Sequence, residues 1–300
     1  LDLCVNAFLK KLVEISCKSV NFDFYKFFAT YSSEYWWNGL FQDHNLFILG
    51  LPVFDVKVPH YWPLVAHEIG HAFYSLMWRR IWKIVLPDLV EYIQKSAPAY
   101  IEKENKRLYL EFWLLHWLKE VISDLFACSL LGASFTVPLI EYLQKHELTV
   151  IEGTHPPLMA RISIQLKYMK KVGLNEMLSI TQEYWKNLSK SAEIEGEKLS
   201  YPFDLEILER IGNIFSRSIR SPVINVISNR IFEVKRNLDA GIIPQDDPLI
   251  IICGLAISRN KFYVRFLGTC LECPATDITL KKLVESKLKE FVSEDIVVEE

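Results

Sequence analysis

Hydrophobic and polar residues alternate with a helical period along most of this chain. Apolar positions three or four residues apart predict a helix over residues 1–30. Two runs rich in β-branched and aromatic residues, 45–49 and 53–58, predict strands, and no other segment of the first 200 residues does. Further helices are predicted over residues 80–102, 104–132, 137–146, 158–171, 174–192, 204–238 and 276–293, while 249–253 fits a buried helix or a strand. The expected fold class is mainly α (α+β).

A sharp change of composition predicts a domain boundary near residue 195. The run 190–198 is polar and charged, in contrast to the apolar-periodic segments on both sides. We therefore expect one domain over residues 1–195 and a mainly helical C-terminal region over residues 200–300. The sequence assigns no role to that second region.

Composition excludes several classes of protein. The chain of 300 residues is 50% apolar and 13% aromatic, which is unlike a disordered protein. Its net charge of −3, with scattered basic residues, argues against a nucleic-acid partner. No apolar run reaches the roughly 18–20 residues of a membrane span, and the nearest candidate, 125–140, is interrupted by small polar residues and a proline. Peripheral association with a membrane and the oligomeric state are left open.

The cysteines favour a reducing compartment. Six cysteines in a chain this long are too sparse for a disulfide framework, so a cytoplasmic or membrane-peripheral location is expected. The sequence begins with Leu1 rather than Met, so the absence of a leader is weak evidence about location. Cys270 and Cys273 form one CxxC pair, whereas a zinc ribbon needs two. We interpret this pair as ordinary thiols or one structural bridge, with redox activity left open.

The most informative motif is the run from His67 to His71, which reads His-Glu-Ile-Gly-His. In a helix, His67 and His71 lie one turn apart on the same face, as two ligands of one metal ion must. Glu68 follows the first ligand and is placed to act on a metal-bound water. Pro63 suits a first helical turn, and Gly70 would let another element approach the helix closely.

A third ligand is expected on the helix that carries Glu120 and Asp124. These two acids are four residues apart on a strongly apolar helix, where carboxylates are costly unless they are paired or bind metal. We predict Glu120 as the ligand and Asp124 as the acceptor of an imidazole N–H. His116 and Glu111 are rival ligands, and exposure of both acids at a helix edge is the remaining alternative.

His155 is the last candidate of the site. Two prolines follow it and predict a rigid turn that leads into a helix. Such a turn would hold the imidazole at a fixed angle, from which it could donate a hydrogen bond to an oxyanion.

These motifs, in this order, resemble the gluzincin metallopeptidases, most closely the HtpX-like and CAAX prenyl-protease family. The resemblance covers roughly residues 40–170. By it, His67, His71 and Glu120 are the ligands of one Zn²⁺ per chain, Glu68 is the general base and His155 assists the transition state. It also implies a zincin-like domain with a small β element before the HExxH helix. The matching runs are His67-Glu68-Ile69-Gly70-His71, Glu120-Val121-Ile122-Ser123-Asp124 and Thr154-His155-Pro156-Pro157, followed by Arg161-Ile162.

The resemblance implies a zinc-dependent endopeptidase that acts on a peptide or protein. Glu68 would take a proton from a zinc-bound water whose pKa falls from ~15.7 toward ~7. One alternative is a latent or non-catalytic zinc-binding protein of gluzincin fold that serves as an interaction or regulatory module. Another is a regulatory protease of a different gluzincin lineage.

Overall fold

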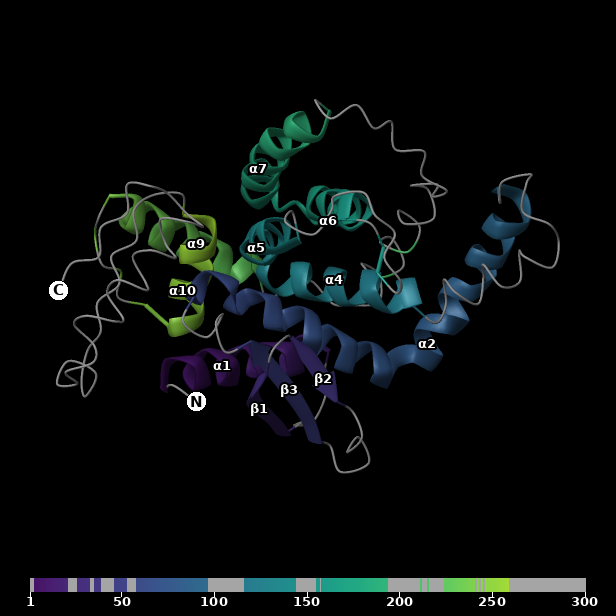
Figure 1. Ribbon diagram of the computed structural model, residues 1–300, viewed down its shortest axis with the longest axis horizontal. Helices are drawn as coiled ribbons and strands as arrows, with labels where there is room; N and C mark the ends of the chain where they lie inside the picture. The colour runs from purple at the N-terminus through teal and green to yellow at the C-terminus, as the bar shows by residue number, and fades with distance from the viewer. Residues whose placement is uncertain are drawn as a thin grey trace.

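The fold is seen in a computed structural model of the chain (Figure 1). The structure describes residues 3–20, 26–32, 35–38, 46–52, 58–96, 116–143, 155–156, 158–193, 211, 215, 224–240, 242, 244 and 246–258. Most of these residues are helical, which confirms the prediction of a mainly α chain. The helices are α1 (Leu3–Val20), α2 (Val65–Ser96), α4 (Leu118–Leu131), α5 (Ala133–Leu143), α6 (Leu158–Val172), α7 (Asn175–Glu193), α9 (Ile224–Asp239) and α10 (Pro248–Ile257).

A three-stranded sheet precedes the longest helix. Its strands are β1 (Lys26–Ser32), β2 (Trp36–Asn38) and β3 (Leu46–Pro52), in the order β1-β3-β2. β3 pairs parallel with β1 and antiparallel with β2. The short 3-10 helix η3 (Pro59–Leu64) then leads directly into α2. Figure 1 shows α2 running across the molecule, with α4 on one side and the sheet on the other.

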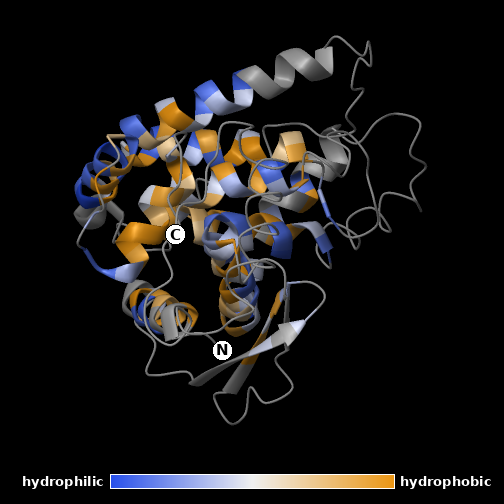
Figure 2. Cartoon of the chain, turned by 60° about the vertical axis from the view of Figure 1, so that its left-hand side comes forward, coloured by the Kyte–Doolittle hydropathy of each residue, from blue (hydrophilic) through white to orange (hydrophobic). Residues whose placement is uncertain are grey.

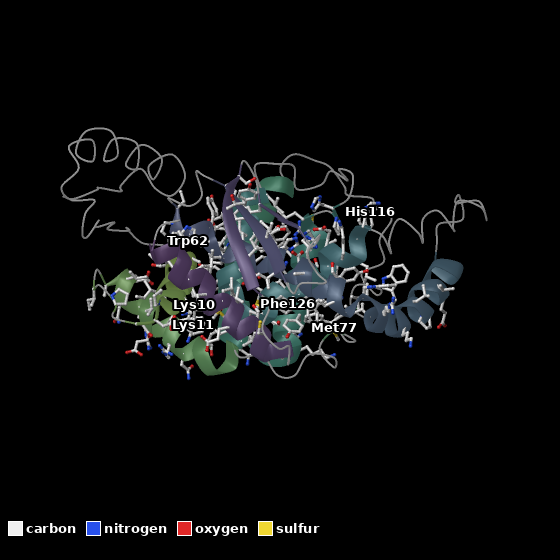
Figure 3. All side chains as sticks on the ribbon, turned by 90° about the horizontal axis from the view of Figure 1, so that it is seen from below. Lys10, Lys11, Trp62, Met77, His116 and Phe126 are labelled. Atoms are coloured by element: carbon white, nitrogen blue, oxygen red, sulfur yellow. The ribbon has the colours of Figure 1, made fainter. Side chains whose placement is uncertain are left out.

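Helix α4 lies at the centre of the core. All of its residues except Lys119 are buried, since α2, α5, α6 and α9 pack around it. Phe126, labelled in Figure 3, stacks on Phe73 of α2 with ring centroids 4.8 Å apart. Figure 2 shows that hydrophobic residues gather where the helices face one another. Gly132, at a φ of 55°, ends α4 in a conformation that glycine adopts without strain and allows α5 to follow at once.

Helices α9 and α10 belong to the same hydrophobic core as α1–α7. Helix α10 packs on α1, η3 and α5, and buried residues of α9 and α10 join the core cluster. Asp247 caps α10 by accepting a hydrogen bond from the Leu249 N–H (2.9 Å), and Pro248 occupies the first helical turn. The ambiguous segment 249–253 is therefore helical. The proposed boundary near residue 195 stays a prediction.

Three local predictions were wrong. Residues 26–30 were expected in a helix but belong to β1, and residues 36–38, where no strand was expected, form β2. Both segments are strands because they pair with β3, and pairing with a distant segment cannot be predicted from the local sequence pattern. The helix predicted from residue 80 is the second half of α2, which continues through Pro87. The strand predicted over 53–58 and the helix over 276–293 lie outside the described residues, apart from Val58.

Membrane insertion finds no support in the described helices. None of them combines the length and the apolar character that a span requires.

Candidate metal centre

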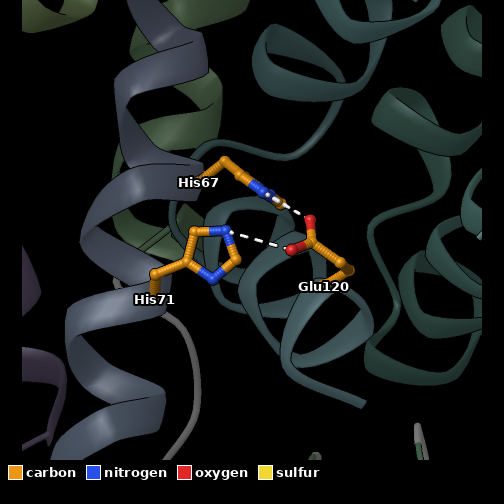
Figure 4. Close-up of side chains that lie close together, drawn as sticks. All are labelled: His67, His71 and Glu120. Carbon is orange, nitrogen blue, oxygen red and sulfur yellow. Dashed lines mark hydrogen bonds and ion pairs between the residues drawn. The ribbon is translucent and has the colours of Figure 1, made fainter. Parts of the chain in front are cut away.

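Two helices bring His67, His71 and Glu120 to one point. Figure 4 shows the two imidazoles projecting from α2 toward the Glu120 carboxylate on α4. The distances are 3.2 Å from His67 Nε2 to Glu120 Oε2 and 3.5 Å from His71 Nε2 to Glu120 Oε1. Three donor atoms, one from each residue, lie within 4.8 Å of one another, and all three residues are buried. This spacing suits a single ion bound at ~2.1 Å from each donor.

The two histidines differ in charge when no metal is bound. Burial lowers the pKa of His67, but the neighbouring carboxylates of Asp124 and Glu120 outweigh burial and raise that pKa to about 9. Burial, with the nearby charge of His67, lowers the pKa of His71 to about 3. At neutral pH His67 is therefore an imidazolium and His71 a neutral imidazole. Burial raises the pKa of Glu120, but its hydrogen bond with His67 and the neighbouring cations bring the pKa below the usual value.

Residues behind the centre hold both imidazoles in place. Asp124 Oδ1 lies 2.8 Å from His67 Nδ1, a close ion pair in which the ring N–H is not aligned for a regular hydrogen bond. Ser123 Oγ lies 3.0 Å from His71 Nδ1. Both contacts leave Nε2 of each ring directed at Glu120, so the Nε2 atoms are the ones available to a metal ion.

Arg161 of α6 supports Asp124 in turn. The guanidinium donates two hydrogen bonds to this carboxylate, of 2.6 Å from Nε and 2.7 Å from Nη2, and both residues are buried. Burial raises the pKa of Asp124, but the charge and hydrogen bonds of Arg161 keep it below the usual value. The buried chain Arg161–Asp124–His67 therefore connects α6, α4 and α2.

Gly70 allows α2 and α4 to approach closely enough to form the centre. A Cβ added at this position would lie 2.7 Å from Ser123 Cα and 2.8 Å from Ser123 O, both backbone atoms. Because backbone cannot move aside as a flexible side chain can, a larger residue would push the two helices apart.

Replacing Gly70 by Ala is therefore expected to destabilise the fold by about 1–3 kcal/mol, the usual cost of overpacking. Metal affinity should fall as well, because the two imidazoles move away from Glu120. Thermal unfolding and metal titration check both effects. Lys83→Ala, at an exposed position of α2, is the control and should stay within about 0.5 kcal/mol of wild type. Equal stability and metal affinity in both variants would contradict the close-packing argument.

Glu68 and His155 flank the three candidate ligands. Glu68 is buried, and burial raises the pKa of its carboxyl group. His155 Nε2 lies 3.4 Å from Glu120 Oε2, and its side chain is 58% exposed. A buried carboxylate beside a metal ion can accept a proton from a water molecule, and an exposed imidazole at its edge can contact what enters.

Of the rival ligands, His116 is not part of the cluster. It lies just before α4 (Figure 3), and the group of donors found among the described residues does not include it. Glu111, Thr154 and Pro157 lie outside the described residues. The supporting roles of Ser123 and Arg161 were not predicted, because each depends on a contact between distant segments. The polar position of Ser123, on the same face as Glu120 and Asp124, was the only signal for it.

Comparison with known proteins points to the other end of the chain. The family model of the NifU-like domain matches residues 253–299. No curated protein and no solved structure matches the chain. The NifU-like family consists of iron–sulfur cluster scaffolds. The match starts at Cys253 on α10, and residues 259–299 lie outside those that the structure describes.

This match overturns the interpretation as a gluzincin metallopeptidase of the HtpX-like and CAAX prenyl-protease type. Zinc-dependent endopeptidase function was wrong, as was the alternative of a latent or non-catalytic zinc module. Zn²⁺ as cofactor and the protease keywords were wrong for the same reason, since a NifU-like domain implies an iron–sulfur cluster. A peptide or protein substrate has no support in the comparisons. The physical reason is that HExxH and ExxxD spacings determine which donors share a helix face, but neither the metal nor the reaction.

Proposed function

We propose that this chain takes part in iron–sulfur cluster assembly and holds a cluster, as cargo, on its C-terminal segment. The observation that carries the proposal is the match of residues 253–299 to the NifU-like domain. The donors of this segment fit the cargo, because cysteine thiolates hold iron–sulfur clusters and the segment contains the CxxC pair Cys270 and Cys273.

The third cysteine of the segment is unsuited to this role. Cys253 is fully buried in α10, and burial raises the pKa of its thiol to about 12. It therefore stays protonated and packed in the core. The matched segment of each chain then offers two thiolates, from Cys270 and Cys273, whereas clusters are commonly held by four. Two copies of the chain are needed for one cluster, so loading should convert the chain into a dimer.

Replacing Cys270 and Cys273 by Ser is expected to abolish cluster binding, because hydroxyls are poor ligands for iron in clusters. The test is anaerobic reconstitution with an iron salt, inorganic sulfide and a thiol reductant, followed by visible absorption, acid-labile sulfide and native mass. Cys17→Ser, at a cysteine of α1 outside the matched segment, is the control and should load like wild type. A wild-type chain without cluster, or a double variant that retains it, would refute the proposal.

A second candidate function is hydrolysis at the metal centre, with Glu68 as general base. We propose that His67, His71 and Glu120 bind a divalent metal ion there. The observation that favours catalysis is the buried carboxylate of Glu68, next in sequence to one ligand and without a ligand role itself. When bound, such an ion lowers the pKa of a coordinated water. The zincin-like class expected for residues 1–195 stays a prediction.

Glu68→Gln tests this second function. It should leave metal content unchanged and lower the hydrolysis of an activated ester by about 10²–10⁴-fold, because the amide cannot accept the proton. Glu91→Gln, at an exposed position of α2, is the matched control. Equal hydrolysis by the two variants would exclude Glu68 as the base.

A further inference from the structure

We propose that the centre formed by His67, His71 and Glu120 binds Fe²⁺ and supplies it to the NifU-like segment of the same chain. This inference rests on the proposed function in cluster assembly and assigns a role to the metal centre within it. Iron is cargo that passes through the centre.

The donor set fits ferrous iron. Two imidazoles and one carboxylate from two helices converge on one point, and this group of described donors contains no thiolate. This two-histidine, one-carboxylate set with open positions is typical of mononuclear Fe²⁺. A site that passes iron on must bind it without the sulfur ligands of a cluster. Nitrogen and oxygen donors meet this requirement.

The ligands are buried, but the centre has an exposed edge. The His67 and Glu120 side chains are 10% and 2% exposed, whereas that of His155 is 58% exposed. His155 approaches the same Glu120 oxygen that His67 contacts, at 3.4 Å against 3.2 Å. An ion that enters or leaves past His155 therefore exchanges one imidazole neighbour for another while it keeps the Glu120 carboxylate.

The matched segment begins in contact with the helix that packs on the centre. Ser134 Oγ of α5 donates a hydrogen bond to the backbone oxygen of Cys253, at 2.9 Å. The next residue, Phe135, lies parallel to the imidazole of His67, with ring centroids 6.4 Å apart. Two consecutive residues of α5 thus join the first residue of the NifU-like segment to a metal ligand.

The transfer is a ligand exchange in which no electron moves. The bonds from Fe²⁺ to the two imidazoles and the Glu120 carboxylate break, and bonds to the sulfurs of Cys270 and Cys273 form. The two thiols release two protons as they bind iron. One proton returns to the His67 imidazole, which loses its bond to iron, and the other goes to water. Iron stays ferrous, and thiolate sulfur is a favourable destination for it.

The test follows the ligands of iron in the full chain. Wild type is loaded anaerobically with less than one ⁵⁷Fe²⁺ per chain, unbound iron is removed with a ferrous chelator, and Mössbauer spectra are recorded over time. The expected spectra show nitrogen- and oxygen-ligated Fe²⁺ first and sulfur-ligated Fe²⁺ later. A chain with both Cys270→Ser and Cys273→Ser should keep the first signal.

His71→Ala should lose its iron to the chelator, because its affinity for Fe²⁺ should be lower by at least about 10–100-fold. Mutation of residues that only hydrogen-bond to a metal ligand already has effects of that size. His116→Ala, which leaves all three ligands in place, is the control. Iron retained by His71→Ala, or iron in wild type that never reaches sulfur, would overturn this inference. Failure of the proposed function is distinct, because then no cluster forms in wild type even with excess free iron and sulfide.

Discussion

Replacing Arg161 by Ala is expected to reduce the free energy of unfolding by about 3–5 kcal/mol, the cost of removing one partner from a buried ion pair. Arg161 donates two hydrogen bonds to Asp124, and both residues are buried. Without the guanidinium, the carboxylate keeps only its contact with His67 and remains in the core.

The same change should weaken the metal centre. Arg161 fixes the Asp124 carboxylate, and this carboxylate in turn fixes the His67 ring. Without Arg161, the Asp124 carboxylate can move, and the His67 imidazole can then rotate away from the position in which it binds metal. Arg161→Lys should recover part of the stability, because it keeps the charge but not the two-pronged geometry. Chemical denaturation checks the order of the variants. Lys170→Ala, at an exposed position of α6, is the control, and equal stability of Lys170→Ala and Arg161→Ala would show that the ion pair contributes nothing.

Metal binding is expected to release about one proton per ion near neutral pH, because His67 must be deprotonated before its Nε2 can bind metal. With a pKa of about 9, this residue is protonated in the metal-free chain, whereas His71, at about 3, has no proton to release. Apparent affinity should therefore rise by about ten-fold per pH unit up to pH 9 and level off above it. Calorimetric titration in buffers of different ionisation enthalpy measures the proton count directly.

The metal-free chain should respond to pH in the opposite direction. The pKa of His67 is higher in the folded state than its value of 6.5 in the unfolded chain, so protonation stabilises the fold. This stabilisation is fully present below pH 6.5 and is lost as the pH rises toward 9. Glu120→Ala should remove metal binding and most of the proton release with it. Metal binding without proton release would show that His67 is neutral in the free chain and would contradict the buried arrangement with Asp124 and Glu120.

The four-residue spacing of the candidate ligands was enough to predict that the members of each pair lie close together. His67 and His71 are four residues apart, as are Glu120 and Asp124, so each helix presents its pair on one face whatever the rest of the chain does. Gly70 also indicated the close contact of the two helices, since a small residue beside buried donors suits such an approach.

Features that depend on distant contacts were beyond the local pattern. β1 is a strand because β3 lies beside it, and Arg161 supports the centre because α6 crosses α4. The chemistry was harder still, since the same donors suit several metals and reactions. The NifU-like segment was overlooked because Cys270 and Cys273 were considered as an isolated pair, without the residues around them.

The most direct test of cluster assembly is the iron and acid-labile sulfide content of the full chain purified without oxygen. We expect iron and sulfide in about equal amounts, as iron–sulfur clusters contain, in a dimer that loses both with Cys270→Ser. Iron without labile sulfide would leave a metal-binding protein but no cluster. If the chain contained no iron and no sulfide, even after reconstitution, a role in holding an iron–sulfur cluster would be excluded.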